Sequence, residues 1–180
     1  AKSATAATDP AGLAVDITYD GSPTAPAAAG SYAVTGTVNE ANYAGAATGT
    51  LTIAKAAATV SLDNLAHTYD GTAKSATATT DPAGLAVIIT YNGATNLPVG
   101  AGSYAVTGTV NEANYAGGAT GTLTIAKATA DVTLGGLLQY YNGKPKPATA
   151  TTVPPGLTVD FTYDGAANPP TAVGSFAVTG

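Results

Sequence analysis

Few side chains in this sequence are of types that carry chemistry, and they do not form a recognisable catalytic set. The chain has one histidine, His67, and no cysteine. A histidine acts as a general base when a serine, a cysteine or a carboxylate stands at a suitable spacing, and none does so here. We therefore expect His67 to have a structural or surface role. We predict no catalytic residue, no cofactor and no enzymatic activity.

Metal binding is also weakly encoded. A zinc site with one histidine and no cysteine would need three carboxylates. Aspartate and asparagine gather in YDG, DPAG and NEAN turns, but the D-x-[DN]-x-[DN]-G series of a calcium loop does not occur. Turn residues of this kind usually hydrogen-bond the local backbone. We therefore predict no metal site.

One covalent possibility follows from the residue types present. An intramolecular Lys–Asn isopeptide bond needs a lysine, an asparagine and a buried carboxylate together. Glu112 stands beside Asn111 and Asn114, and the candidate lysines are Lys74 and Lys127. Both lysines lie near predicted strand ends, where lysine extends into solvent and protects sheet edges. We therefore expect no such bond.

Charge and hydropathy exclude two further classes. The formal net charge of −5 argues against a protein that binds the phosphate backbone of nucleic acids. No apolar run reaches the roughly 18 residues that a membrane-spanning helix needs. The sequence opens without an initiator methionine or the features of a signal peptide, so we interpret it as part of a longer protein.

An internal repeat determines how the chain is divided into domains, and these domains carry any site. AKSATAATDPAGLAV at Ala1 returns almost unchanged 72 residues later, and so does GSYAVTGTVNEANYAG at Gly30. A more divergent third copy follows at the same spacing. We predict three domains: a partial repeat at 1–55 that lacks its first strand, a complete repeat at 56–127, and a partial, divergent repeat at 128–180 that lacks its last strand.

The pattern within each repeat predicts strands and tight turns. In GLAVDITYDG, Leu13, Val15, Ile17 and Tyr19 face one way, and smaller or polar residues face the other. Asx-Gly pairs mark turns that need positive φ. These pairs are Asp20-Gly21, Asp70-Gly71, Asn92-Gly93, Asn142-Gly143 and Asp164-Gly165. The segment NEANY at 39–43 is the one place where we predict a brief helical or 3₁₀ bend.

Several ordered motifs together resemble a known family. AHTYDGT at Ala66, DPAGLAV, GAGSYAVTGTVNEANYAG and GTLTIAK are similar to the MBG (mostly β-grasp) and YDG repeats of large bacterial surface adhesins. The resemblance covers the whole chain, although the third copy departs from it at YYNGKPK. It implies an all-β fold of tandem small β-grasp-like domains with little or no helix. On strand alternation alone, repeats of a bacterial Ig-like β-sandwich remain the alternative.

The resemblance also implies a structural role. Linkers without Gly/Ser or Pro runs predict a stiff, extended rod. We expect a tandem-repeat stalk segment of a bacterial cell-surface or secreted adhesin or fibre, located outside the cell and projecting a functional tip. One alternative is a ligand-binding adhesion module that uses the variable loops at 22–28, 94–100 and 166–172.

A second alternative concerns assembly. The incomplete repeats would exchange strands between molecules, which would make the chain a self-assembling filament subunit. The expected partners are therefore neighbouring repeats of the same chain or further copies of it. Neither a nucleic acid nor a small-molecule substrate is expected.

Overall fold

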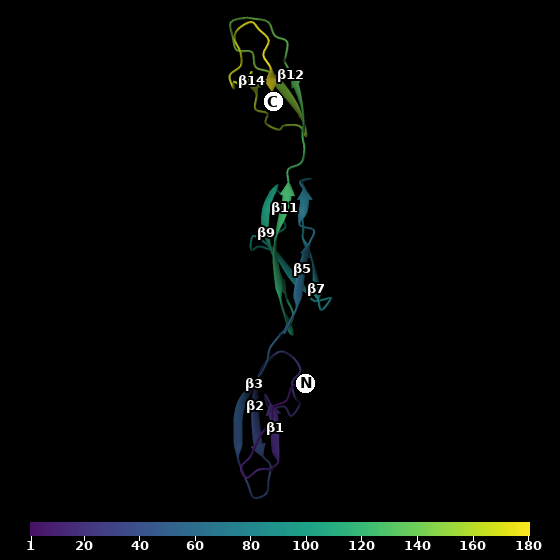
Figure 1. The fold of residues 1–180 in the computed structure, drawn as a ribbon, viewed down its shortest axis with the longest axis vertical. Helices are drawn as coiled ribbons and strands as arrows, with labels where there is room; N and C mark the ends of the chain where they lie inside the picture. The colour runs from purple at the N-terminus through teal and green to yellow at the C-terminus, as the bar shows by residue number, and fades with distance from the viewer. The chain divides into compact units, whose positions relative to one another are not determined.

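The computed structural model describes all residues 1–180 and consists of β-strands joined by turns and loops, with no helix (Figure 1). This confirms the predicted all-β class of small tandem β-domains. The chain divides into two compact units, residues 1–127 and residues 128–180. No helix is present that is long and apolar enough to span a membrane.

The complete repeat lies in the first unit, and its sheet is closed by segments from both of its ends. The strand order is β6-β11-β9-β8. β6 (Ala66–Thr68), near the start of the repeat, lies parallel to the last strand, β11 (Gly118–Ala126), which in turn pairs antiparallel with β9 (Gly102–Val110). β8 (Val87–Tyr91) completes the other edge. The four-stranded sheet therefore requires both ends of the repeat.

A two-stranded sheet covers one face of this arrangement. β5 (Thr59–Asp63) pairs antiparallel with β7 (Thr77–Asp81). Leu62 of β5 reaches Gly108 of β9 so closely that a Cβ on this glycine would lie 3.0 Å from the leucine Cδ2. The glycine therefore leaves room for β5 to approach the sheet.

The core of the repeat is built from alternate residues of these strands. Leu123 and Ile125, two positions apart on β11, are 0 % and 2 % exposed, whereas Thr124 between them is exposed. They pack with Val106 and Tyr91. The Tyr91 hydroxyl accepts a hydrogen bond from the Ala76 N–H at 2.8 Å, so this buried polar group is satisfied.

The Asx-Gly turns fall into two kinds. At Asp20-Gly21, Asn92-Gly93 and Asp164-Gly165 both residues have positive φ, as predicted for tight turns. At Asp70-Gly71 and Asn142-Gly143 only the glycine does. There the Asx side chain accepts a hydrogen bond from the backbone N–H two residues on, which forms an Asx turn instead.

The predicted helical bend at 39–43 is wrong. The segment forms only a bend between β2 (Gly30–Val38) and β3 (Ala46–Ile53). Asn39 N–H donates to Ala14 O at 2.9 Å, and Glu40 Oε1 accepts from Ala14 N–H at 3.0 Å. These contacts to the neighbouring extended segment hold the chain away from a helical path.

The first and third repeats keep the same plan with fewer paired strands. In the first repeat, β1 (Val15–Tyr19), β2 and β3 form a sheet of order β1-β2-β3. In the second unit the pairing is limited to two short sheets. Their strands are β12 (Asp131–Gly135) with β13 (Thr149–Val153), and β14 (Thr162–Tyr163) with β15 (Val178–Thr179).

Closure of the repeat by β11 predicts unequal effects of one substitution at matching positions. Leu123→Ala should lower the free energy of unfolding of the first unit by about 2–5 kcal/mol, because it leaves a cavity in the packed core. Leu51→Ala in β3 should cost less than half as much, because Leu51 is only half-buried. Urea denaturation followed by circular dichroism measures both, and equal losses would contradict this view of the core.

Candidate functional site

The linker between the first and second repeats is paired along its length. β4 (Ala56–Ala57) lies parallel to β10 (Tyr115–Ala116) of the complete repeat. Ala56 N–H donates to Asn114 O at 2.8 Å, and Ala58 N–H donates to Ala116 O at 2.9 Å. The linker is thus a strand of a small sheet rather than a free tether.

Two side-chain contacts strengthen the same junction. Lys55 Nζ donates to Glu112 O at 2.8 Å, and Asn114 Oδ1 accepts from Ala29 N–H at 2.8 Å. The NEAN turn of the second repeat therefore contacts both the end of the first repeat and Ala29, the residue that follows its variable loop. Gly117 lies beside the linker, where a Cβ would stand 2.0 Å from Ala58 O. We call this set of contacts the repeat junction.

The residues considered for an isopeptide bond have other partners. Glu112 Oε1 accepts from Ala86 N–H at 3.0 Å, as Glu40 does from Ala14 in the first repeat. Lys74 Nζ donates hydrogen bonds to Asp70 Oδ2 and Thr72 Oγ1, and Lys127 is exposed. Asn111 N–H donates to Ala86 O at 2.8 Å. No charged side chain is buried, so the buried carboxylate that the reaction needs is missing.

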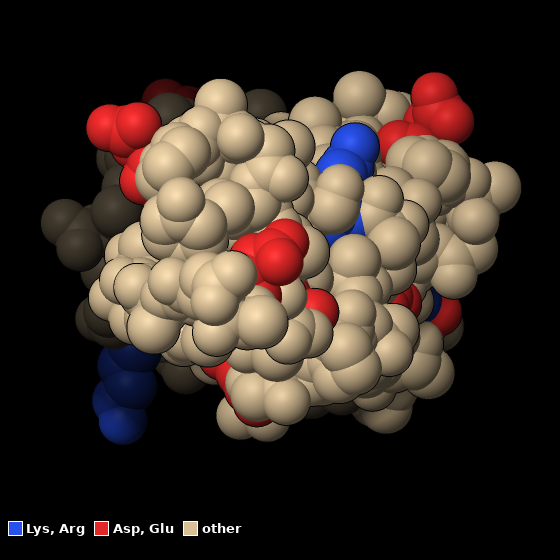
Figure 2. Space-filling view, turned by 90° about the horizontal axis from the view of Figure 1, so that it is seen from below, with Lys and Arg blue, Asp and Glu red and all other residues tan.

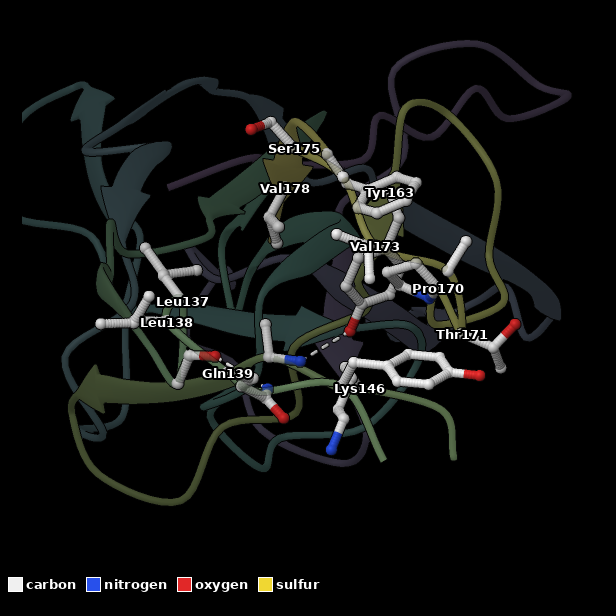
Figure 3. Close-up of a pocket in the computed structure, with 16 residues that line it drawn as sticks. Leu137, Leu138, Gln139, Lys146, Tyr163, Pro170, Thr171, Val173, Ser175 and Val178 are labelled. Carbon is white, nitrogen blue, oxygen red and sulfur yellow. Dashed lines mark hydrogen bonds between the residues drawn. The ribbon is translucent and has the colours of Figure 1, made fainter. Parts of the chain in front are cut away.

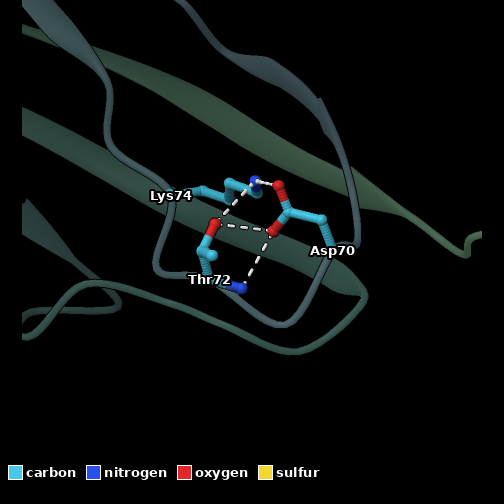
Figure 4. Close-up of polar contacts among 3 residues, drawn as sticks. All are labelled: Asp70, Thr72 and Lys74. Atoms are coloured by element: carbon cyan, nitrogen blue, oxygen red, sulfur yellow. Dashed lines mark hydrogen bonds and ion pairs between the residues drawn. The ribbon is translucent and has the colours of Figure 1, made fainter.

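A polar cluster of Asp70, Thr72 and Lys74 holds the YDG turn of the complete repeat (Figure 4). Asp70 Oδ1 accepts from the N–H and Oγ1 of Thr72 at 2.9 and 2.6 Å, and Oδ2 forms an ion pair with Lys74 Nζ at 2.5 Å. The hydrogen bond from Lys74, followed by those from Thr72, holds the pKa of the Asp70 carboxyl well below its ordinary value. The contacts of the cluster fix the turn.

His67 takes a structural role. Its Nε2 lies 2.9 Å from Asn64 O, on the turn that leads into β6. At the matching positions of the third repeat, Gln139 Nε2 donates to Gly136 O at 2.8 Å. Asn64 and Gly136 both have positive φ. Histidine and glutamine thus make equivalent contacts with the carbonyl of the same turn.

The variable loops are anchored by their backbone rather than by the residues that vary. Lysine N–H donates to a proline carbonyl in all three copies, at 2.7 to 2.9 Å: Lys2 to Pro26, Lys74 to Pro98 and Lys146 to Pro170. In the complete repeat, Leu97 and Val99 of the loop are exposed. The loops carry no aromatic residue, and aromatic side chains are the usual anchors of a binding surface.

Charged residues are sparse and scattered. Figure 2 shows one face of the molecule, on which isolated carboxylates and lysines stand on an otherwise uncharged surface. No group of three or more His, Cys, Asp or Glu residues is arranged to hold a metal ion.

The second unit contains an open groove of about 440 Å³ lined by residues of 136–178 (Figure 3). Leu137 and Leu138 line it on one side and Tyr163 and Val173 on the other. The Tyr163 hydroxyl accepts from Ala148 N–H at 2.8 Å, which repeats the Tyr91–Ala76 contact of the complete repeat. Sequence reasoning did not anticipate this groove.

Smaller grooves in the first repeat lie where the complete repeat carries β5. One of about 370 Å³ is lined partly by Gly36, Gly49 and Leu51. In the complete repeat the glycine that matches Gly49 is Gly121, and a Cβ there would lie 3.2 Å from Leu65 Cδ1. A Cβ on Gly49 would meet nothing within 4 Å. The groove lies where Leu62 and Leu65, from the opening segment of the complete repeat, pack against Gly121.

The polar cluster generates a prediction for NMR titration of the Asp70 carboxyl. Its pKa should lie below the ordinary aspartate value of about 3.9. The stabilisation from the ionised group is then present above that ordinary value and is lost only as pH falls through the lowered pKa. Lys74→Met should raise the pKa toward about 3.9, because the hydrogen-bonded ammonium group is removed. Lys144→Met is the control, and an unchanged Asp70 pKa in Lys74→Met would show that the lysine is not the cause.

The comparisons with known proteins agree with the repeat plan. A family model described as MBG domain matches residues 1–57, 58–129 and 130–180. No curated protein and no solved structure matches the chain significantly. The matched segments together span the whole chain, and therefore it belongs to the MBG domain family as a tandem array of that domain.

Proposed function

We propose that this chain is a non-enzymatic stalk segment of a bacterial cell-surface or secreted adhesin or fibre, which holds a functional tip away from the cell. The observation that carries the proposal is the repeat junction. The pairing of the linker with β10, together with the hydrogen bonds from Lys55 to Glu112 O and from Ala29 to Asn114 Oδ1, restricts bending between neighbouring repeats. A spacer needs restricted bending in order to hold its tip at a distance. A catalytic or soluble regulatory domain has no such need.

The closure of the repeat suits a load-bearing role. β6 and β11 are parallel neighbours, so the start of one and the end of the other lie at opposite ends of the pair. Tension applied between the start of β6 and the end of β11 is then directed along these two strands. The tension therefore shears the β6–β11 hydrogen bonds, which bear the load together and do not open one at a time.

The proposal predicts a narrow range of distances across the repeat junction. The chain has no cysteine, so Ser31→Cys and Ser103→Cys place two unique spin labels at matching exposed positions of β2 and β9. Pulsed electron paramagnetic resonance on the full chain should give one narrow distance distribution. Gly117→Ala should broaden it, because the added methyl group collides with the carbonyl of Ala58 in the linker.

Gly45→Ala is the matched control for this experiment. Gly45 occupies the same position in the first repeat, where a Cβ would lie 3.6 Å from Val38 Cγ2, an ordinary contact. The control should leave the distance distribution narrow. A broad distribution in the parent chain would refute the stiff junction and, with it, the stalk.

The proposed location is tested separately. Antibodies against residues 56–127 should label intact, unpermeabilised cells of the source bacterium or its secreted fibres, and brief protease treatment of those cells should remove the signal. Labelling only after permeabilisation would place the protein inside the cell and exclude the adhesin reading.

A further inference from the structure

The two asparagine–glycine pairs of the chain lie in different kinds of turn. Asn92-Gly93 forms a tight turn closed by an antiparallel bridge between Tyr91 and Ala94. Asn142-Gly143 lies in the Asx turn of the third repeat. An asparagine side chain cyclises onto the backbone nitrogen of the next residue most readily when that residue is glycine, because glycine has no side chain to obstruct the approach. The local structure then decides which of the two pairs reacts.

The Asn92 side chain is held away from its own backbone. Its Oδ1 accepts a hydrogen bond from Ala105 N–H at 2.9 Å, and its N–H donates to Ala105 O at 2.8 Å. The flanking residues Tyr91 and Ala94 exchange two backbone hydrogen bonds, at 2.6 and 3.0 Å. Cyclisation onto the nitrogen of Gly93 would have to break the contact with Ala105 and distort this turn. The folded hairpin therefore protects Asn92.

The Asn142 side chain, in contrast, is folded back over its own backbone. Its Oδ1 accepts from Lys144 N–H at 3.2 Å, within the same turn, and no hydrogen bond ties Asn142 or Gly143 to a neighbouring strand. Both residues are exposed. A Cβ on Gly143 would meet nothing within 4 Å. The glycine nitrogen and the asparagine amide can therefore approach each other without disturbing packed structure.

The complete repeat shows that this openness belongs to the turn itself. Asp70-Gly71 stands 72 residues before Asn142, in a repeat whose four-stranded sheet is closed. The Asp70 side chain is nevertheless 57 % exposed, and a Cβ on Gly71 would also meet nothing within 4 Å. Asp70 Oδ1 accepts from the N–H of Thr72, two residues on, as Asn142 does from that of Lys144. The turn is thus open in a fully paired repeat.

We propose that Asn142 is a site of spontaneous deamidation, whereas Asn92 is protected from it. The backbone nitrogen of Gly143 gives up its proton to water and bonds to Cγ of Asn142. The Cγ–Nδ2 bond breaks, and the amide group takes up a proton and leaves as ammonia. Water then opens the cyclic imide. Cleavage of the bond between the imide nitrogen and Cγ gives aspartate, and cleavage of the bond to the backbone carbonyl carbon gives isoaspartate.

The aspartate product would give the third repeat the residue that the complete repeat encodes as Asp70. Lys146 stands at the position of Lys74, which forms an ion pair with Asp70. Both lysine N–H groups donate to a proline carbonyl at 2.9 Å, so the two backbones are held alike. Deamidation of Asn142 therefore places a carboxylate beside a lysine that lacks one in the sequence. This modification is separate from the stalk role and does not depend on it.

The test is ageing of the full chain at neutral pH, with the products at each asparagine measured by tandem mass spectrometry of proteolytic fragments. Asn142 should convert to aspartate and isoaspartate at least about tenfold faster than Asn92, because reaction at Asn92 needs local opening of the hairpin. In urea that unfolds the chain, the two rates should become similar. Equal rates in the folded chain, or conversion of Asn142 only in urea, would overturn the proposal.

Two matched variants separate the effect of the turn from that of the residue pair. Asp70→Asn creates an asparagine–glycine pair in the open turn of the complete repeat, and it should react at a rate close to that of Asn142. Asp20→Asn creates the same pair in a hairpin turn, where the Asp20 side chain accepts from Ala33 N–H at 2.8 Å, and it should react as slowly as Asn92. Reaction of Asp20→Asn as fast as Asp70→Asn would overturn the role of the turn and leave the stalk untouched.

Discussion

The parallel pairing of β6 with β11 is the contact on which the rest of the complete repeat depends. It joins residues from the opening and closing segments of the repeat and lets Leu123 and Ile125 enter the core. The first repeat forms a three-stranded sheet with grooves beside Gly36 and Gly49. In the third repeat, the segment that matches β9 is paired over only two residues, β15.

At the repeat junction, one short turn makes contacts with two repeats. The NEAN turn serves its own repeat through Glu112, which accepts a backbone hydrogen bond from Ala86. It serves the preceding repeat through Asn114, which receives the N–H of Ala29. A short turn without a helix can make both sets of contacts because its neighbouring segments are extended. Structural hydrogen bonds thus account for most of the polar residues that invite a search for chemistry.

The strands, the turns and the repeat period follow from sequence pattern because each is a local property. Alternation places Tyr19 and Ile17 on one face, and paired Asx-Gly residues predict three of the tight turns. The parallel pairs are not local. Nothing in the residues of 56–57 or 66–68 specifies that they lie beside 115–116 and 124–126. The bend at 39–43 was mispredicted because its helical propensity is outweighed by backbone contacts to Ala14.

The pairing of the linker with β10 also couples the folding of adjacent repeats. When one repeat opens, its neighbour loses the hydrogen bonds at Asn114 and Ala116 that cross the junction. In a linear array with nearest-neighbour coupling of this kind, stability is the sum of repeat terms and interface terms. A terminal repeat has one such interface and an internal repeat has two. Melting of a long array therefore starts at its ends, and cooperativity grows with the number of repeats.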